Sequence, residues 1–459
     1  MSNTPEAAVV VDVRANPPSP HVIDVREFID ARGMSSRQWL LLVLCMLLVV
    51  ADGMDVAIMG FLVPAISREW RVSHEMFGIV LSAAPIGLAV GSLLVGPRAD
   101  RYGRKRVLLA SVLLFGLFSL AASLAGSITE LVVMRFISGL GLGATMPCTT
   151  TLLSEYVPTR SRSLLITCMF TGFNLGSALI GFIAAAMIPT YGWRAVLVVG
   201  GCLPLLALPF YWRWLPESAR FMVVRRAPPA RIARTLNGVC RTDIAADTRF
   251  VSDEPQVAPK RRVAALLKPA FRGTTLALWT AYFMGLVVIY LFSSWMPTLI
   301  TASGLSIEHA ANVTALFQVG GTVGAILVGF VMDRRVPQRV IAIAYLGGAA
   351  AALLLGVIHA ASALFVAVVI LAGFCISGAQ TGLNAHAPAC YPTEIRATGV
   401  SWMLGIGRFG SIFGSMIGGV MLTAGWSAAT ILASLTVPGI LAALAVLGGR
   451  AHALHAGRH

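Results

Sequence analysis

The chain has 459 residues, of which 57% are hydrophobic and only 12% are charged. An ordinary soluble domain carries about 25% charged residues, and a fold of this size cannot bury so much apolar surface. The net charge of +15 would suit a nucleic-acid partner, but the basic residues gather in alternate connections between the apolar segments. That distribution is typical of a membrane protein, so we expect a lipid bilayer around the chain and no nucleic acid.

The first 38 residues are polar, and residues 21–33 are compatible with either a short amphipathic helix or a solvated tail. Twelve apolar blocks follow, each able to span about 30 Å of hydrocarbon as a helix rising about 1.5 Å per residue. We predict spans at 39–63, 76–97, 105–125, 129–153, 163–188, 194–214, 274–298, 308–332, 338–358, 361–385, 397–420 and 425–448.

These blocks predict an all-α membrane protein with twelve transmembrane helices in two six-helix halves. The expected units are an N-terminal tail (1–38), a first bundle (39–214), a central loop (215–271), a second bundle (272–448) and a C-terminal tail (449–459). Of the 35 Lys and Arg residues, 30 fall on the side of the N-terminus. Since cytoplasmic loops are rich in Lys and Arg, both termini and the central loop are expected to be cytoplasmic.

The two halves repeat one another in sequence. The pattern G-x-x-x-D-R occurs at Gly96–Arg101 and at Gly329–Arg334, an offset of 233 residues. The same offset separates Pro64 from Pro297, expected at the ends of helices 1 and 7, and Gly192-Trp193 from Gly425-Trp426, expected to open helices 6 and 12. A duplicated unit with an even number of spans gives parallel halves, and transporters built that way bind solute between them.

Of the 20 acidic residues, only Asp52 and Asp55 lie deep inside an apolar span. A spacing of three residues places both carboxylates on one helix face. An ionised carboxylate there costs at least about 2.5–3.5 kcal/mol, and two together repel, so at least one proton should be held more tightly than in water. The pair is therefore a candidate for proton binding and release, and the alternative is a structural pair bonded to neighbouring helices.

Two arginines also lie within predicted spans. Arg408 falls near the middle of the eleventh span, where its guanidinium needs an anion. The Asp pair is one candidate, and a substrate carboxylate bound by two hydrogen bonds is the other. Arg135 lies about six residues into the fourth span, so it either joins the proton site or extends to the outer surface.

Polar and aromatic side chains in the spans are candidates for lining a solute cavity, since planar ligands pack against such rings. For any single aromatic residue, lipid contact or core packing is the alternative. The predicted substrate-binding residues are Arg408, Asn174, Phe170, Phe173, Tyr282, Tyr290, Gln318 and Trp402, and the further candidates are Gln380, Asn384 and Trp295. No nucleotide-binding loop, metal-ligand spacing or nucleophile elbow occurs in the sequence. We therefore expect no enzyme activity, no cofactor and no metal, and a functional monomer.

Several motifs resemble the major facilitator superfamily. These are GPRADRYGRKRV after the second span, RFISGLGLGA in the fourth and YWRWLPESARF after the sixth. The resemblance implies that Asp100, Gly103 and Arg104 belong to a gating loop. Asp100-Arg101 and Asp333-Arg334 look like latches between the halves, the alternative being plain topology anchors. A proline in the fifth span, typical of drug antiporters, is absent from GFNLGSALIG, which favours uptake.

Narrower motifs are similar to the aromatic acid:H⁺ symporters, which carry 4-hydroxybenzoate, protocatechuate, benzoate or gentisate. They are DGMDVAIMGFLVPAI, TLLSEYVPTRSRSLLITCMFTGFNLG and YPTEIRATGVSWMLGIGRFGSIFG. The resemblance implies proton-coupled import of an aromatic acid across a bacterial inner membrane. It implies roles in the transport cycle for Asp52, Asp55, Arg135, Glu155, Arg396 and Arg408, with Arg396 among the gating residues. The remaining alternatives are a proton-driven exporter of drugs or other solutes and a membrane sensor that transports nothing.

Overall fold

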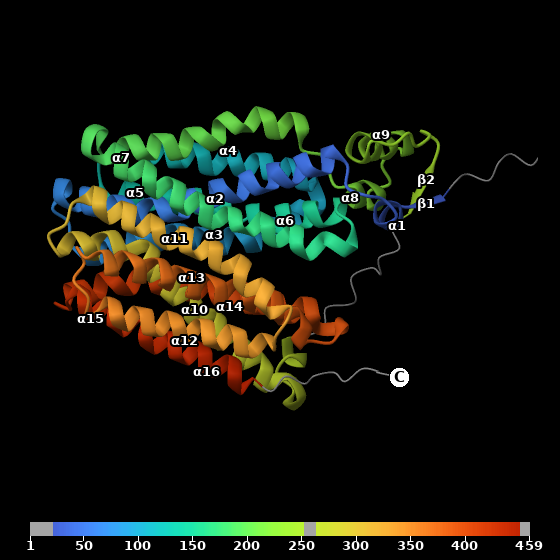
Figure 1. Cartoon of the computed structure of the whole chain (residues 1–459). Coiled ribbons are helices and arrows are strands. Elements are labelled where there is room, and N and C mark those ends of the chain that lie inside the picture. Colours follow the sequence, from blue (N-terminus) through green and yellow to red (C-terminus); the bar gives the residue numbers. More distant parts are fainter. Residues whose placement is uncertain (1–21, 252–262, 450–459) are drawn as a thin grey trace, which may run out of the picture.

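Long helices lying side by side make up most of the computed structural model, which describes residues 22–251 and 263–449 (Figure 1). Within these residues, eleven helices are long and apolar enough to cross a membrane. One of them, α7 (Thr159–Trp214), is 56 residues long and breaks at Gly192, where φ is 75°. Glycine adopts this backbone conformation without strain, so the chain can turn sharply at Gly192. The break divides α7 into two crossings, and counting both of them accommodates the predicted twelve spans.

The first bundle is formed by helices that turn back and forth across the apolar layer. Ser35 begins the first of them with a capping box, in which its hydroxyl and the Gln38 side chain each accept a backbone N–H. The helices before α7 are α2 (Ser36–Trp70), α3 (His74–Tyr102), α4 (Arg104–Ala122), α5 (Ile128–Leu142) and α6 (Thr145–Tyr156). The predicted fourth span is therefore two helices, α5 and α6, in succession.

The second bundle repeats this arrangement. Its helices are α10 (Pro269–Ala302), α11 (Ile307–Met332), α12 (Pro337–Leu355), α13 (Ala363–His386), α14 (Thr393–Thr423), α15 (Ala428–Ser434) and α16 (Thr436–Gly448), with short 3₁₀ turns η1 (Val263–Ala265) and η2 (Ala387–Cys390). Gly425 has a φ of 82° and precedes α15, as Gly192 divides α7 in the first half. The backbone thus reverses at equivalent positions in the two halves.

The prediction that Pro64 and Pro297 end their helices is wrong. Helix α2 continues from Pro64 to Trp70, and α10 continues from Pro297 to Ala302. Proline removes one N–H donor and crowds the carbonyl four residues earlier. Helices that cross membranes tolerate this change where neighbouring helices pack around the freed groups, and both prolines are buried.

Glycines bring the backbones of paired helices into direct contact, and the pairing is the same in both halves. In the first half, a Cβ atom on Gly53 or Gly176 would lie about 2 Å from a carbonyl oxygen of the partner helix, Phe173 of α7 or Val50 of α2. In the second half, Gly410 and Gly414 of α14 meet the α10 backbone in the same way. Small residues at such crossings permit close helix approach.

The two halves share one apolar core at only one end of the molecule. We call the end that carries α1 (Val25–Asp30), α8 (Ala219–Val224) and α9 (Pro229–Cys240) the α9 end (Figure 1). At the opposite end a single apolar cluster includes residues of both halves, such as Phe61 of α2 and Trp295 of α10. Toward the α9 end, the described core divides into two clusters, each drawn from one half.

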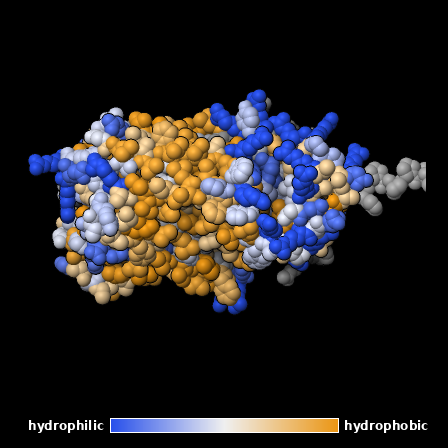
Figure 2. Space-filling model, turned by 90° about the horizontal axis from the view of Figure 1, so that it is seen from above, coloured by the Kyte–Doolittle hydropathy of each residue, from blue (hydrophilic) through white to orange (hydrophobic). Residues whose placement is uncertain are grey.

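The α9 end also carries a small folded unit, formed by the N-terminal and central segments that the sequence predicts to be polar. Strand β1 (Val22–Asp24) pairs in parallel with β2 (Arg249–Val251), and α1 follows β1 directly. Helix α9 buries Ile232 and Leu236 on one face. Of the two alternatives for residues 21–33, the structure shows the helix, over six residues. The surface shows an apolar band between two polar ends, as a membrane protein requires (Figure 2).

Candidate functional site

Asp52 and Asp55 of α2 lie near the middle of the molecule in very different surroundings. Both are only 1% exposed. Asp55 forms a buried ion pair with Arg135 of α5: Nη1 donates to Oδ1 at 2.8 Å and Nη2 to Oδ2 at 2.9 Å. Ser119 of α4 and Ser138 of α5 also donate to the Asp55 carboxylate, at 2.6 and 3.0 Å. Two parallel charge-assisted bonds and two hydroxyls leave this carboxylate fully bonded.

Arg135 is 1% exposed and does not extend to the surface. Its Nη2 also donates to the backbone oxygen of Asp55, at 2.6 Å, which fixes the guanidinium against α2. The structure therefore places Arg135 with the helix-1 acids, and the surface alternative is wrong.

Asp52 lies one turn earlier on α2 and lacks such bonding. No described residue donates a hydrogen bond to its buried Oδ1. The charged groups that act on it electrostatically are Arg408 of α14 and Asp55. Arg408 is half-buried in the middle of α14, in the other half of the molecule. The two charged groups thus belong to opposite bundles and lie within electrostatic range of each other.

Two of the predicted binding residues lie near Arg408. Tyr282 and Tyr290 of α10 are buried, and both lie close enough to feel the charge of Arg408. Tyr282 also lies near the amide side chains of Gln380 and Asn384 on α13. The phenol of Tyr345 donates to Oε1 of Gln380 at 2.7 Å, which orients that amide. The result is one cationic group among hydroxyls and amides in the second half.

The other predicted binding residues are distributed more widely. Gln318 of α11 donates to the Ser293 hydroxyl of α10 at 3.0 Å, so it joins two helices of its own half. Asn174 of α7 lies across from Gly321 of α11, between the halves. Phe173 contacts Gly53 through its backbone, and Phe170 is exposed. Trp402 stacks on Trp279 with ring centroids 5.9 Å apart, and 41% of its surface is exposed.

The predicted gating residues lie at the α9 end. Gly103 has a φ of 97° and joins α3 to α4, and a Cβ atom there would overlap the Glu217 carboxylate at 2.4 Å. Arg104 lies over the Phe221 ring of α8, and the backbone oxygen of Arg101 accepts from Arg225 at 2.8 Å. The side chain of Asp100 lies outside the described residues. The described side chains of this loop therefore contact the segment after α7.

The equivalent residues of the second half are more exposed. Asp333 ends α11 at the surface, and Arg334 covers the Phe330 ring at 4.2 Å. Arg396 at the start of α14 donates to the backbone oxygen of Tyr391 at 3.3 Å. Among the described side chains no ion pair links Asp333 to the first half. The side chain of Asp100 lies outside them, so the latch stays a prediction.

Glu155 and the missed Glu217 belong to one bonded network at the same end. Ser218 donates to Glu155 at the end of α6, and Tyr156 donates to the Glu217 backbone at 2.5 Å. Glu217 Oε1 accepts the backbone N–H groups of Lys105 and Ser218. Its place in the sequence PES, directly after a predicted span, was the available signal. Sequence reasoning also missed Ser119 and Ser138, because a serine in an apolar helix does not reveal which charge it faces.

Comparison with known proteins agrees with the fold. The model of the Major Facilitator Superfamily matches residues 45–386 and 278–456. The chain belongs to this superfamily of membrane transporters. It is 54% identical to a gallate transporter of Pseudomonas putida, over 94% of this chain and 96% of the relative. It is 48% identical to the 4-hydroxybenzoate transporter PcaK of the same organism, over 93% and 95%.

Solved structures show the same fold at much lower identity. The inward open xylose transporter XylE from E. coli matches with a TM-score of 0.70 and 18% identity, covering 89% of this chain and 95% of that one. At this distance the likeness establishes the fold alone. The relatives near 50% identity confirm the resemblance to transporters of aromatic acids.

Proposed function

We propose that the chain imports a small aromatic carboxylate together with a proton, across the inner membrane of a bacterium, by alternating access. The observation that carries the proposal is that the buried Asp52 of the first bundle lies within electrostatic range of the half-buried Arg408 of the second bundle. A mid-membrane acid and base facing across a moving interface suit a proton and an organic anion as joint cargo. Relatives that transport gallate and 4-hydroxybenzoate support the aromatic acid.

The α9 end is the cytoplasmic end in this proposal, because it carries most of the Lys and Arg residues. The bundles of residues 39–214 and 272–448 are the two bodies that rock against each other. The shared apolar core at the opposite end supports a conformation closed toward the outside. The separate cores of the two halves at the α9 end support access from the cytoplasm.

Arg408 binds the substrate carboxylate in this scheme. Its guanidinium has no bidentate carboxylate partner among the described residues, whereas Arg135 has one in Asp55. Tyr282 and Tyr290 supply ring faces and hydroxyls beside it, and the amides of Gln380 and Asn384 are close enough to bond to ring hydroxyls of a substrate. The more distant Phe170, Phe173, Asn174, Gln318 and Trp402 stay predictions.

Asp52 is the residue we assign to proton exchange. A buried carboxylate that accepts few hydrogen bonds gains most by taking a proton, and substrate binding at Arg408 removes the one cation that favours its charge. Asp55 and Arg135 then serve as fixed neighbours whose bonds join α2 to α5, and the role of Glu155 stays a prediction. This assignment gives different roles to Asp52 and Asp55, which could not be distinguished from the sequence.

Uptake by purified protein in proteoliposomes tests the proposal. With an acidic exterior, we expect accumulation of radiolabelled gallate, 4-hydroxybenzoate or benzoate above the equilibrium level. Asp52→Asn should abolish accumulation while substrate still equilibrates, whereas Asp243→Asn, an exposed acid of the central segment, should behave as wild type. The proposal fails if no aromatic acid accumulates, or if Asp52→Asn accumulates it normally.

The carboxylate site has a separate test. Arg408→Lys keeps the positive charge but loses the planar pair of donors, so we expect the apparent KM to rise about tenfold or more. The same uptake assay measures it, with Arg234→Lys, at an exposed position of α9, as the matched control. An unchanged KM would place the carboxylate at another residue.

A further inference from the structure

Two cavities at the α9 end have no part in the function proposed above. They have volumes of about 370 and 330 Å³, within the size range of small-ligand sites. Arg106, Glu217 and Arg231 line both of them, so the two are neighbouring parts of one hollow. The hollow lies between the beginning of α4, the end of α7 and the helices α8 and α9.

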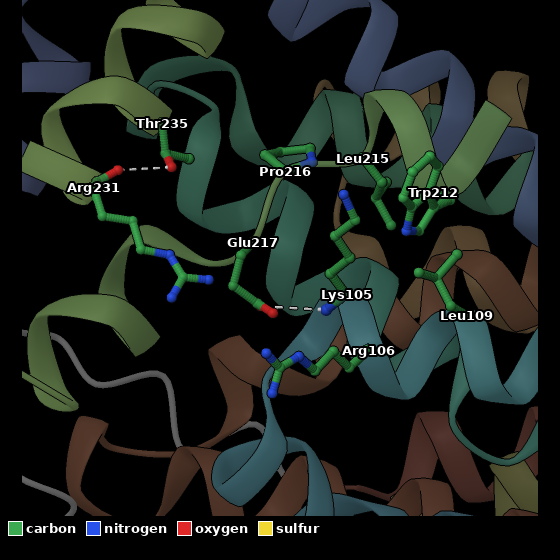
Figure 3. A pocket seen from close by; sticks show the side chains of 9 residues that line it. All are labelled: Lys105, Arg106, Leu109, Trp212, Leu215, Pro216, Glu217, Arg231 and Thr235. Atoms are coloured by element: carbon green, nitrogen blue, oxygen red, sulfur yellow. Dashed lines mark hydrogen bonds between the residues drawn. The ribbon is translucent and has the colours of Figure 1, made fainter. Parts of the chain in front are cut away.

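The lining is strongly cationic. Five basic side chains and a single carboxylate contribute to it; the basic ones are Lys105, Arg106, Arg225, Arg226 and Arg231. Figure 3 shows Arg106 from α4 and Arg231 from α9 pointing toward the space beside Glu217. Like charges brought together repel, so this arrangement costs free energy unless an anion occupies the hollow.

The single carboxylate does not neutralise these cations. Glu217 Oε1 already accepts the backbone N–H of Lys105 at 3.2 Å and that of Ser218 at 2.9 Å. Elsewhere at the ends of the helices, arginines have carboxylate partners, as in Arg194–Glu69 and Arg26–Asp30. Within the described part of the chain, Arg106, Arg226 and Arg231 have no such ion pair. The hollow therefore has unused capacity for negative charge.

The rest of the lining indicates what kind of anion fits. Leu109, Trp212 and Leu215 line the cavity beside the basic groups. Trp212 is 67% exposed at the end of a membrane-crossing helix, a position typical of the boundary between lipid and water. The hollow thus combines basic groups with apolar side chains beside a tryptophan at the expected lipid boundary, which suits a charged head attached to an apolar chain.

We propose that this hollow binds a phosphate group of net negative charge, held by Arg106 and Arg231, and that an anionic phospholipid headgroup supplies it. Guanidinium groups bind phosphate oxygens through paired hydrogen bonds. The bound phosphate bridges α4 to α9 and so fastens the helices of the central segment to the loop around Gly103. Soluble phosphate shares the headgroup chemistry and is the other source that the experiment distinguishes.

The test measures binding to purified full-length protein in a neutral detergent, read as protection against thermal unfolding. The probes are dioctanoyl phosphatidylglycerol, dioctanoyl phosphatidylcholine and inorganic phosphate. The variants are Arg106→Gln, Arg231→Gln and the double variant. Arg234→Gln is the matched control, because Arg234 is exposed on α9 and lines neither cavity. The single Arg231→Gln keeps the test valid if the double variant does not fold.

We expect phosphatidylglycerol to protect the wild type and Arg234→Gln, with the apparent Kd raised about fivefold by each cavity substitution and about 25-fold by both. Protection by phosphatidylglycerol alone supports the lipid source. Equal protection by inorganic phosphate, lost in the same variants, upholds the phosphate site but overturns the lipid source. The site itself is refuted if phosphatidylcholine protects as well as phosphatidylglycerol, or if the cavity variants bind as the wild type does.

Discussion

At the scale of single residues, the hydrogen bonds around Asp52 and Asp55 determine the role that each carboxylate can have. Asp55 accepts four side-chain hydrogen bonds, two of them from Arg135, whereas Oδ1 of Asp52 accepts none from the described residues. Removing one partner of a buried ion pair leaves the other charge uncompensated, which is far more costly than removing an isolated group. The two acids should therefore respond differently to the same substitution.

We predict that Asp55→Asn lowers the free energy of unfolding by about 3–5 kcal/mol, because it leaves Arg135 buried without a counter-ion. Asp52→Asn should lower it much less, since its carboxylate has few bonds to lose. Thermal unfolding of the two purified variants in detergent compares them directly.

A second substitution provides the control for this prediction. Removing both charges in Asp55→Asn/Arg135→Gln should recover part of the lost stability, because no uncompensated charge remains. If the double variant is as unstable as the two single losses added together, the pair does not act as a unit.

At the residue scale, the sequence identified the charged residues of the site but not how they pair. Charged residues in long apolar spans are rare, so Asp52, Asp55, Arg135 and Arg408 could be selected from the sequence. Their pairing could not, because the rotation and depth of each helix are set by packing between helices. From the sequence, Asp52 and Asp55 are equally good partners for Arg408. Only the structure shows that α5 places Arg135 beside Asp55.

At the scale of helices, two kinds of glycine contact have different consequences. Gly53 and Gly176 join α2 to α7 within one half, and the contact is kept as the halves move. Gly60 of α2 instead meets α10 of the other half, where a Cβ atom would lie 2.4 Å from the Ser293 carbonyl oxygen. The second contact must separate when the opposite end opens.

We predict that Gly60→Ala shifts the population toward a conformation open at the opposite end, because the methyl group cannot fit against the α10 backbone. Spin labels at Arg71 and Ser303, in a cysteine-free background, would report a longer distance between the halves. Gly405→Ala is the control, since a Cβ atom at Gly405 meets nothing within 4 Å. Identical distance distributions in the two variants would show that this contact does not hold the end closed.

The docking of α1 gives a second prediction at this scale. Asp30 accepts the backbone N–H and the hydroxyl of Thr159 at the start of α7, and it pairs with Arg26. Although partial burial opposes it, these bonds hold the pKa of Asp30 below its ordinary value of 3.8. A lowered pKa means that the contribution to docking is present at neutral pH and is lost as the pH falls through that lowered value.

We therefore predict that Asp30→Asn releases α1 at neutral pH, because the amide keeps the shape but loses the charge-assisted bonds. Hydrogen exchange of the backbone amides of residues 25–30 should become faster than in the wild type. Asp247→Asn, an exposed acid of the central segment, should leave this exchange unchanged. Equal protection in Asp30→Asn and wild type would mean that apolar contacts alone dock the helix.

Prediction of the helices succeeded wherever composition alone decides, and failed where local backbone geometry does. Hydropathy located the spans, but the end of α2 was misplaced because Pro64 lies within a buried helix. The division between α5 and α6 was missed although Gly143 at the end of α5 and Pro147 in the first turn of α6 are signals for it, because glycines in an apolar span equally favour close packing of a continuous helix. Gly192 and Gly425 were recognisable because their equivalent positions repeat between the halves.

At the scale of the whole molecule, the charges on the cargo decide which energy source drives the proposed import. A monoanion bound at Arg408 and one proton bound at Asp52 carry no net charge together. Moving one elementary charge across the membrane exchanges about 2.3 kcal/mol per 100 mV, but an uncharged pair exchanges none of it. The proton concentration gradient still contributes about 1.4 kcal/mol per pH unit.

We predict that uptake with one proton per monoanion follows the pH gradient and ignores the membrane potential. In proteoliposomes, valinomycin with equal potassium on both sides clamps the potential at zero and should leave acid-driven accumulation unchanged. Nigericin, which exchanges protons for potassium, should abolish it. If an inside-negative potential alone drives accumulation, more than one proton accompanies each anion, and a second site besides Asp52 must carry it. Asp55 would then be the first candidate, since separating it from Arg135 in another conformation would free its carboxylate.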